Sequence, residues 1–542
     1  MYIQPNTNIR LLSNVPIDNT YEHTIYFETE SDQRAYFLSK TKRNFTAQTF
    51  QRIDRGIARL QVAIGDVYDC NYMMFQNTSF STKWFYAFIT SVEYINNEVT
   101  EIRFEMDDMQ TWLFDYTLGD CYIERQHTET DDIGDNIVPE PVALGEYVFN
   151  NELDADKYQA LQFTNLENGT DFTELAVIVA VVDVGASASH GQIYDGVYGG
   201  ATMYAFRASD VAGINAKISE YIQAPDSILS IYMLPIVNFR FTLPSLSGGI
   251  IVTGNAHGAQ GRYEGAALTG TEKLDGYSPK NKKLYTYPYN YFHVDNASKS
   301  SLCLRYEFFK DLQPFLRTAS TITQPVKCVL YPSQYKGVGL EQPYAEFTTP
   351  LLTESIELSD FPLCSWNVDT YKAWVAQNSI PLALNSAASI GSTAISAAFS
   401  TNPAASLING TLGVAANALS QAYSASIAAD MCKGSLNNGG VNCTTKKQTF
   451  FGGRASITSD IAKRIDDFFT YFGYQINELR VPNRAARPHW TYVKTSTCVF
   501  SGSAPNDAMR KISDIYNRGI TWWKNGDEVG DYSLDNGVTT NE

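Results

Sequence analysis

The stretch that decides the fold is Trp84–Met106, with the sequence WFYAFITSVEYINNEVTEIRFEM. Residues 84–94 are rich in aromatic and β-branched side chains, and residues 100–106 alternate between polar and apolar ones. Asn96 and Asn97 lie between these halves, and Asn tolerates the left-handed backbone of a tight turn. The stretch therefore predicts a hairpin of two antiparallel strands within a small barrel-like β domain.

Segments on both sides of this hairpin extend the prediction. Residues 24–29, 34–38 and 57–64 also carry strand signals, so we expect β structure throughout residues 1–120. Farther along, residues 174–184 predict a buried strand, and residues 210–222 predict an amphipathic helix.

Two more helices are expected near the C-terminus, at residues 457–472 and 504–518, because apolar residues recur there at helical spacing. Ser503 is the expected N-cap of the second helix and Gly519 its expected stop. The fold class is therefore mainly β with some α. The expected domains are an N-terminal barrel-like domain (1–120), a polar connector (121–150), β-rich central domains (151–375), a hydrophobic loop (376–453) and a C-terminal α/β segment (454–542).

Composition and motifs exclude several classes of function. The net charge of −17 argues against a general DNA-gripping role, which needs a basic surface. No secretory signal and no stretch of about 18 strongly apolar residues is present. Walker A, HExxH and CxxC motifs are absent and the histidines are dispersed, so we expect no enzyme activity, no metal and no cofactor.

Two sets of charged residues are expected to have structural roles. Asp107-Asp108 and Asp131-Asp132 are paired in sequence, and we expect them to be solvated surface acids. A predicted basic patch, best suited to ion pairs between subunits, consists of Arg480, Arg484, Arg487 and Lys494.

Residues 373–429 contain no Asp, Glu, Lys or Arg, although these types make up 18% of the chain. Ala and Ser dominate, and Asn402-Pro403 interrupts the segment, which predicts two helical arms at 382–400 and 406–429. Composition alone leaves two interpretations open, a hairpin packed within protein and an insert that enters a membrane. The larger apolar residues of the segment are Ile380, Leu382, Leu384, Ile390, Ile395, Phe399, Leu407, Ile408, Leu412, Val414, Leu419, Tyr423 and Ile427.

The residues after this segment suggest how it meets its surroundings. Lys433, Lys446 and Lys447 are candidates for contacts with anionic lipid headgroups. The segment holds no His and no acidic residue before Asp430, which argues against a pH sensor inside it. Whether Cys432 and Cys443 pair is left open.

Several short words occur in a fixed order along the chain: YIERQH at 122–127, DDIG at 131–134, VPE at 138–140, YSPKNKKLYTYPYN at 277–290, FPLCSWNVDTYKAW at 361–374, IDDFFTYFGY at 465–474, VPN at 481–483, RPHW at 487–490 and NRGIT at 517–521. Together they resemble the tail knob (distal tail tube) proteins of small short-tailed phages of Gram-positive bacteria, the Picovirinae-like podophages. The resemblance spans about 120–525 and hardly touches the first 120 residues.

This resemblance implies a hexameric tube at the distal tail tip of the virion, with tail-hub-like β-barrel domains around a DNA channel. It also implies that the hydrophobic loop plugs the tube and then enters the host membrane as a pore. The implied partners are further copies of the chain in a homohexamer, other tail proteins, the host membrane, and phage DNA that passes without specific binding. Synthesis would take place in the host cytoplasm.

One other function stays open at this point. The 34 tyrosines and seven tryptophans also suit a receptor- or glycan-binding tail protein without membrane activity. Such fibres are usually trimers, whereas tubes are sixfold, so the symmetry of the assembly separates the two hypotheses.

Overall fold

A computed structural model describes residues 6–48, 56–79, 81–150, 157–164, 175–181, 193–194, 197–198, 202–221, 227–235, 250–252, 260–268, 273–296, 300–320, 328–336, 355–358, 364–367, 435–436 and 450–538. The chain divides into two compact units. Unit 1 comprises residues 1–146, 277–289 and 457–542, and unit 2 comprises residues 147–276 and 290–456. The chain therefore passes from unit 1 to unit 2 and back twice.

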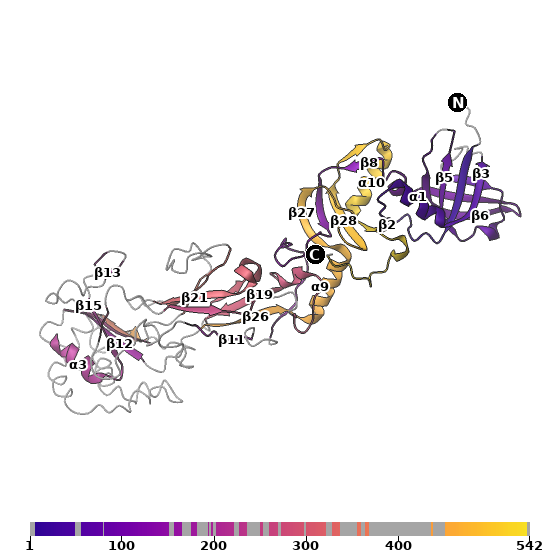
Figure 1. Ribbon diagram of the computed structural model, residues 1–542. Helices are drawn as coiled ribbons and strands as arrows, with labels where there is room; N and C mark the ends of the chain where they lie inside the picture. The colour runs from indigo at the N-terminus through magenta and orange to yellow at the C-terminus, as the bar shows by residue number, and fades with distance from the viewer. Residues whose placement is uncertain are drawn as a thin grey trace. The chain divides into compact units, whose positions relative to one another are not determined.

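The N-terminal part of unit 1 is a half-curled, barrel-like antiparallel sheet (Figure 1). The predicted hairpin at residues 84–106 is confirmed, and Asn96 pairs with Val99 across its turn. In spatial order the strands are β3 (Thr41–Gln48), β1 (Thr7–Ser13), β5 (Cys70–Asn77), β6 (Phe85–Asn96), β7 (Val99–Met106) and β4 (Ile57–Leu60).

The strand predicted at residues 34–38 is wrong, because these residues belong to helix α1 (Glu30–Ser39). The helix begins where the Thr29 hydroxyl accepts a hydrogen bond from the Asp32 amide at 3.2 Å. Its Phe37 is fully buried and stacks on Tyr72 with ring centroids 5.1 Å apart. Residues 34–38 are too few for their pattern to distinguish a strand from a helix, so tertiary packing decides their conformation. We call Phe37, Tyr72, Tyr86 and Phe88 the N-terminal aromatic core.

A second sheet of unit 1 combines strands from both ends of the chain (Figure 1). Its neighbouring strands are antiparallel except for β2 and β30, which are parallel. Trp490, Trp522 and Trp523 are fully buried in it. The spatial order is β2 (His23–Ile25), β30 (Ile520–Trp523), β28 (Trp490–Thr497), β9 (Cys121–Gln126) and β27 (Tyr474–Arg480), and a separate pair joins β8 (Tyr116–Leu118) to β29 (Phe500–Gly502).

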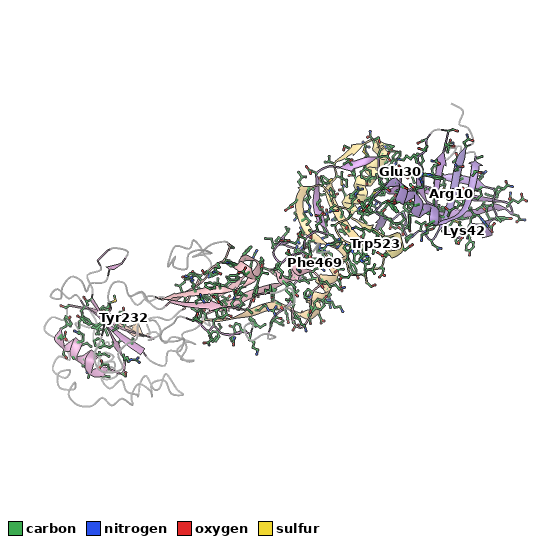
Figure 2. All side chains as sticks on the ribbon, in the orientation of Figure 1. Arg10, Glu30, Lys42, Tyr232, Phe469 and Trp523 are labelled. Atoms are coloured by element: carbon green, nitrogen blue, oxygen red, sulfur yellow. The ribbon has the colours of Figure 1, made fainter. Side chains whose placement is uncertain are left out.

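Both predicted C-terminal helices are confirmed as α9 (Ser459–Phe472) and α10 (Asn506–Arg518). The predicted N-cap at Ser503 is wrong, because Pro505 occupies the cap position of α10. Gly519 ends α10 as predicted, with φ of 96°, a value that favours glycine. Phe469, labelled in Figure 2, is buried on α9. Its ring meets that of Tyr474 edge to face, with the centroids 5.3 Å apart. The short helices of unit 1 are α2 (Asp108–Thr111), η1 (Ile64–Asp66), η5 (Lys282–Tyr285) and η9 (Gly526–Glu528).

Unit 2 contains the predicted buried strand as β12 (Leu175–Val181) and the predicted helix as α3 (Val211–Glu220). Residues 176–181 are all buried, as expected for an apolar strand between two neighbours. In spatial order its largest sheet is β17 (Ile250–Val252), β15 (Thr202–Arg207), β12, β16 (Ile228–Pro235), β24 (Cys364–Asn367) and β25 (Ser435–Leu436).

The remaining strands of unit 2 form two more sheets and a short pair. One sheet is β10 (Tyr147–Phe149), β26 (Phe451–Ile457), β19 (Asn290–Asp295) and β20 (Ser301–Leu304), with β11 (Gln159–Ala160) also on β26. The other is β18 (Gln260–Glu264), β21 (Phe315–Ser320), β22 (Cys328–Pro332) and β23 (Ile356–Leu358). The pair is β13 (Ile193–Tyr194) with β14 (Val197–Tyr198), and the short helices are η6 (Tyr306–Phe308) and η7 (Lys310–Leu312).

The described residues are mostly β with few helices, which confirms the predicted class. Among these residues, no helix is long and apolar enough to span a membrane. The bounds of the five predicted domains stay predictions.

Candidate functional site

A cluster of charged and polar side chains is buried in unit 1, close in sequence to the points where the chain passes to unit 2. It joins residues that lie as much as 343 positions apart in the sequence. We call it the buried polar network. Its members are Arg125, Asp131, Glu140, Asn281, Lys283, Asp466 and Tyr474.

Glu140 is the anion at one end of the network. Its carboxylate accepts a hydrogen bond from Lys283 Nζ at 2.6 Å and ion-pairs with Arg125. The side chains of Glu140 and Lys283 are 0% and 2% exposed, so this charge pair is removed from water. Burial lowers the pKa of Lys283, and the charge of Glu140 raises it in part. Lys283 also donates to the Val138 carbonyl at 2.8 Å, which leaves the ammonium well coordinated.

Asp466, on α9, is the second anion. Its carboxylate accepts hydrogen bonds from the Tyr277 hydroxyl at 2.7 Å and from the backbone amides of Lys280 and Asn281 at 2.8 and 3.0 Å. The Asn281 side chain donates to the same carboxylate at 2.8 Å. Four donors thus attach the returning segment at Tyr277 to α9.

Asp131 connects the connector segment to β27. It accepts a hydrogen bond from the Tyr474 hydroxyl and another from the Lys282 amide at 3.1 Å. Burial raises the pKa of Asp131, and these two hydrogen bonds lower it in part. Its neighbour Asp132 is exposed and pairs with Lys282 at 3.1 Å.

The network therefore consists of charged and neutral polar side chains that bind one another, an arrangement that suits a structural anchor. The segments that it holds end at Glu146, begin at Tyr277 and begin at Ile457, which are three of the passages between the units. Among the described residues, no group of three or more His, Cys, Asp and Glu side chains could hold a metal ion.

Comparison with known protein families finds matches for both the N-terminal and the C-terminal part of the chain. A family model described as the C-terminal domain of the tail knob protein gp9 of Bacillus phage phi29 matches residues 260–537, half of the chain.

The chain belongs to the phage tail knob family.

Individual tail knob proteins are similar in sequence to this chain over nearly its whole length. The tail knob protein gp9 of Bacillus phage PZA is 24% identical, and gp9 of Bacillus phage phi29 is 23% identical, each over 98% of both chains. The tail knob protein gp12 of bacteriophage C1 has a similar solved fold, with a TM-score of 0.54 at 14% identity over 96% of this chain and 97% of that one. Residues 5–117 match a different model, the N-terminus of the caudoviral major tail protein.

The tail knob words in the sequence supply every member of the buried polar network. Arg125 comes from YIERQH, Asp131 from DDIG and Glu140 from VPE, while the words at 277–290 and 465–474 supply the rest. Sequence reasoning missed the network, although these quoted words contained it. The signal available was that each of these words holds charged residues together with apolar or aromatic ones.

Two expectations about charged residues are wrong. Asp107, Asp108 and Asp131 are buried, at 0%, 7% and 9% exposure, because each has donors within reach. The basic patch is not a single surface either. Arg487 is only 3% exposed, and Arg484 lies over the Trp522 ring, 5.3 Å from its centroid.

The predicted plug-loop residues, from Ile380 to Ile427, and the predicted headgroup contacts Lys433, Lys446 and Lys447 lie outside the described residues, as do Cys432 and Cys443. The structure does describe the strands on either side. β24 pairs with β25, with Cys364 opposite Leu436 and Ser365 opposite Ser435.

Proposed function

We propose that the chain is the subunit of a hexameric tube at the distal tip of a short phage tail, bound to other tail proteins, through which DNA is ejected. In this proposal the loop at 376–453 first plugs the lumen and then inserts into the host membrane as a pore. The proposal rests on the family membership and on one observation. The charge-free residues 373–429 lie between two strands that pair with each other.

The pairing of β24 with β25 supports release of the part of the loop that lies between them. Residues 368–434 follow β24 and precede β25, and these two strands are neighbours in one sheet. In this proposal the residues between the strands change their surroundings while the strands retain their hydrogen bonds. This is the mechanical requirement for a segment that is stored in protein and later exposed to lipid.

The composition of the loop fits a shared pore better than a single span. As a helix, residues 406–429 would reach roughly 36 Å, and a bilayer core is about 30 Å thick. Its Ser, Asn and Thr residues make one such helix too polar to stand alone in lipid. Several copies could place these side chains toward a common lumen, with Ile and Leu toward the acyl chains.

The charge balance supports passage of DNA without binding. The chain has 58 acidic and 41 basic residues. An acidic or neutral lumen repels phosphates and removes the counterion release that would hold DNA in place. Because residues 373–429 hold no titratable acid or His, we expect mechanical contact or DNA pressure to release the loop.

Dye leakage from vesicles of phosphatidylglycerol and phosphatidylcholine tests the pore. The full chain should release dye, and the full-length variant Leu412→Asp, with a charge inside the loop, should release little. The matched control is Asn437→Asp, which adds the same charge just after β25. Equal leakage from both variants, or none from the native chain, would overturn the membrane role.

The assembly needs a separate measurement. Mass photometry and negative-stain images of the purified chain should show sixfold rings. A trimer would overturn the tube and favour the receptor-binding hypothesis.

A further inference from the structure

Two cysteines, from the first and the last segment of unit 1, come close together beside its second sheet. Strand β9 begins at Cys121, and Cys498 directly follows β28. The two strands are antiparallel, and Thr497 lies opposite Tyr122. Just beyond, Phe500 lies opposite Leu118 where β29 pairs with β8. Cys121 and Cys498 are thus enclosed between two aligned pairs.

Hydrogen bonds show that the backbones remain close at this point. The Val499 amide donates to the Cys121 sulfur at 3.3 Å, and the Gly119 amide donates to the Val499 carbonyl at 2.8 Å. Residues directly opposite in an antiparallel pair have Cα atoms about 4.5–5.5 Å apart. The register of Thr497 with Tyr122, continued by one residue, puts Cys498 opposite Cys121. Disulfides need a Cα separation of about 4.4–6.8 Å, a range that covers the separation expected for this register.

The two thiols differ in their exposure to solvent. Both are free in this structure, Cys121 fully buried and Cys498 half-buried. Burial raises the pKa of Cys498 to about 12; the Thr495 hydroxyl, 3.1 Å from its sulfur, lowers it in part, and the adjacent Cys121 thiol raises it. The Cys498 thiol therefore stays protonated, so its oxidation in an oxidising medium is slow, and a reducing cytoplasm keeps both thiols reduced.

We propose that Cys121 and Cys498 form an intramolecular disulfide when the protein meets a small disulfide oxidant such as oxidised glutathione. The thiolate of the more accessible Cys498 attacks the oxidant, and one glutathione leaves as a thiol. The Cys121 sulfur then attacks this mixed disulfide at Cys498, and the second glutathione leaves. Two protein S–H bonds are lost, one S–S bond forms, and the oxidant is reduced to two glutathione thiols.

The position of this bond gives it a specific consequence. A bond between residues 121 and 498 closes a ring that contains every residue of unit 2 and all four passages between the units. The two ends of unit 1 would then remain covalently joined after any single cut in unit 2. The disulfide would hold the first and last segments of unit 1 together in a protein that is made in a reducing compartment and used outside it.

Peptide mapping of the full chain tests the proposal. After incubation with oxidised glutathione and alkylation, mass spectrometry should find a linked peptide pair that contains Cys121 and Cys498. A chain nicked in unit 2 by limited proteolysis should migrate as one species without reductant and as fragments with it. Full alkylation of both cysteines, or their linkage to other cysteines, would overturn the proposal.

Three variants make the result specific. Cys498→Ser, at the half-buried position, should abolish the link and leave the circular dichroism spectrum unchanged. Cys121→Ser should also abolish it, although this variant buries a hydroxyl. Cys303→Ser, at an exposed cysteine of unit 2, is the matched control and should retain the link. Persistence of the linked species in Cys498→Ser would contradict the assignment.

Discussion

In the N-terminal aromatic core, Phe37 has no exposed surface and stacks on Tyr72. In the buried polar network, Lys283 is almost as inaccessible, but its ammonium binds the Glu140 carboxylate at 2.6 Å. Both regions belong to unit 1. One is stabilised by apolar area removed from water, the other by charges whose desolvation is offset by specific partners.

The difference predicts how each region tolerates substitution. Packing accepts many apolar residues of similar volume, so the aromatic core should keep its fold through such changes. A buried charge accepts few replacements, because its partner stays behind in the interior. The words at 122–140, 277–290 and 465–474 hold the charged partners, and those words carry the resemblance.

The largest effect is expected for Glu140→Ala. This change leaves the Lys283 ammonium and the Arg125 guanidinium without their shared anion. Breaking a buried pair from one side costs about 3–5 kcal/mol. Urea denaturation followed by fluorescence of the buried Trp490, Trp522 and Trp523 should show this loss in the free energy of unfolding.

A second substitution separates the effect of buried charge from that of side-chain packing. Adding Lys283→Met to Glu140→Ala removes one of the two cations that lost their anion and should recover part of the lost free energy of unfolding. If the double variant is less stable than Glu140→Ala, the network is held by side-chain volume and the comparison drawn above is wrong.

The second largest effect concerns pH and Asp107, next to the N-terminal aromatic core. Burial raises the pKa of Asp107 to about 7, although the Gln110 amide and the Tyr72 hydroxyl lower it in part. The unfolded carboxyl titrates near 3.9. The folded state therefore binds this proton more tightly, and the stability that results is full below about pH 4 and is lost as pH rises through 7. Relative to Asp107→Asn, the native chain should lose about 2–3 kcal/mol between pH 5 and pH 8.

His127, beside the buried polar network, has the opposite sign and provides the control. Burial, followed by the charge of Arg487, lowers its pKa to about 3. Its stability contribution is therefore present above pH 6.5 and is lost as pH falls. His127→Gln should shift the pH curve in the opposite direction to Asp107→Asn. Shifts of the same sign in both variants would contradict the assignment.

The sequence predicted the elements that have a clear local pattern. Helices α9 and α10 follow from apolar residues at helical spacing, and the hairpin at 84–106 and β12 follow from runs rich in aromatic and β-branched residues. It could not predict the burial of Asp131, because its partner Tyr474 lies 343 residues away. The polar residues at 121–150 indicated a connector, yet the first of them form β9, where Arg125 is paired with Glu140. Local composition does not show which charges find distant partners.

A smaller effect is expected for Phe37→Leu in the aromatic core. Leucine remains apolar and fills most of the ring's volume, but the contact with Tyr72 is lost. We expect a loss of about 1–1.5 kcal/mol in the same urea experiment. A loss as large as that of Glu140→Ala would mean that the core is as specific as the network.

The smallest effect is expected for Glu124→Gln, the neighbour of Arg125 on β9. Glu124 pairs with Lys494 at 2.6 Å, but the two side chains are 37% and 38% exposed. Water and salt screen such a pair, so the loss should be no more than about 0.5 kcal/mol and should vanish in 1 M NaCl. Glu140→Ala should remain costly in the same salt, because its cations are buried. Burial, and not the presence of an ion pair, would then account for the contrast between these charges. Equal salt sensitivity of the two variants would show that water reaches Glu140.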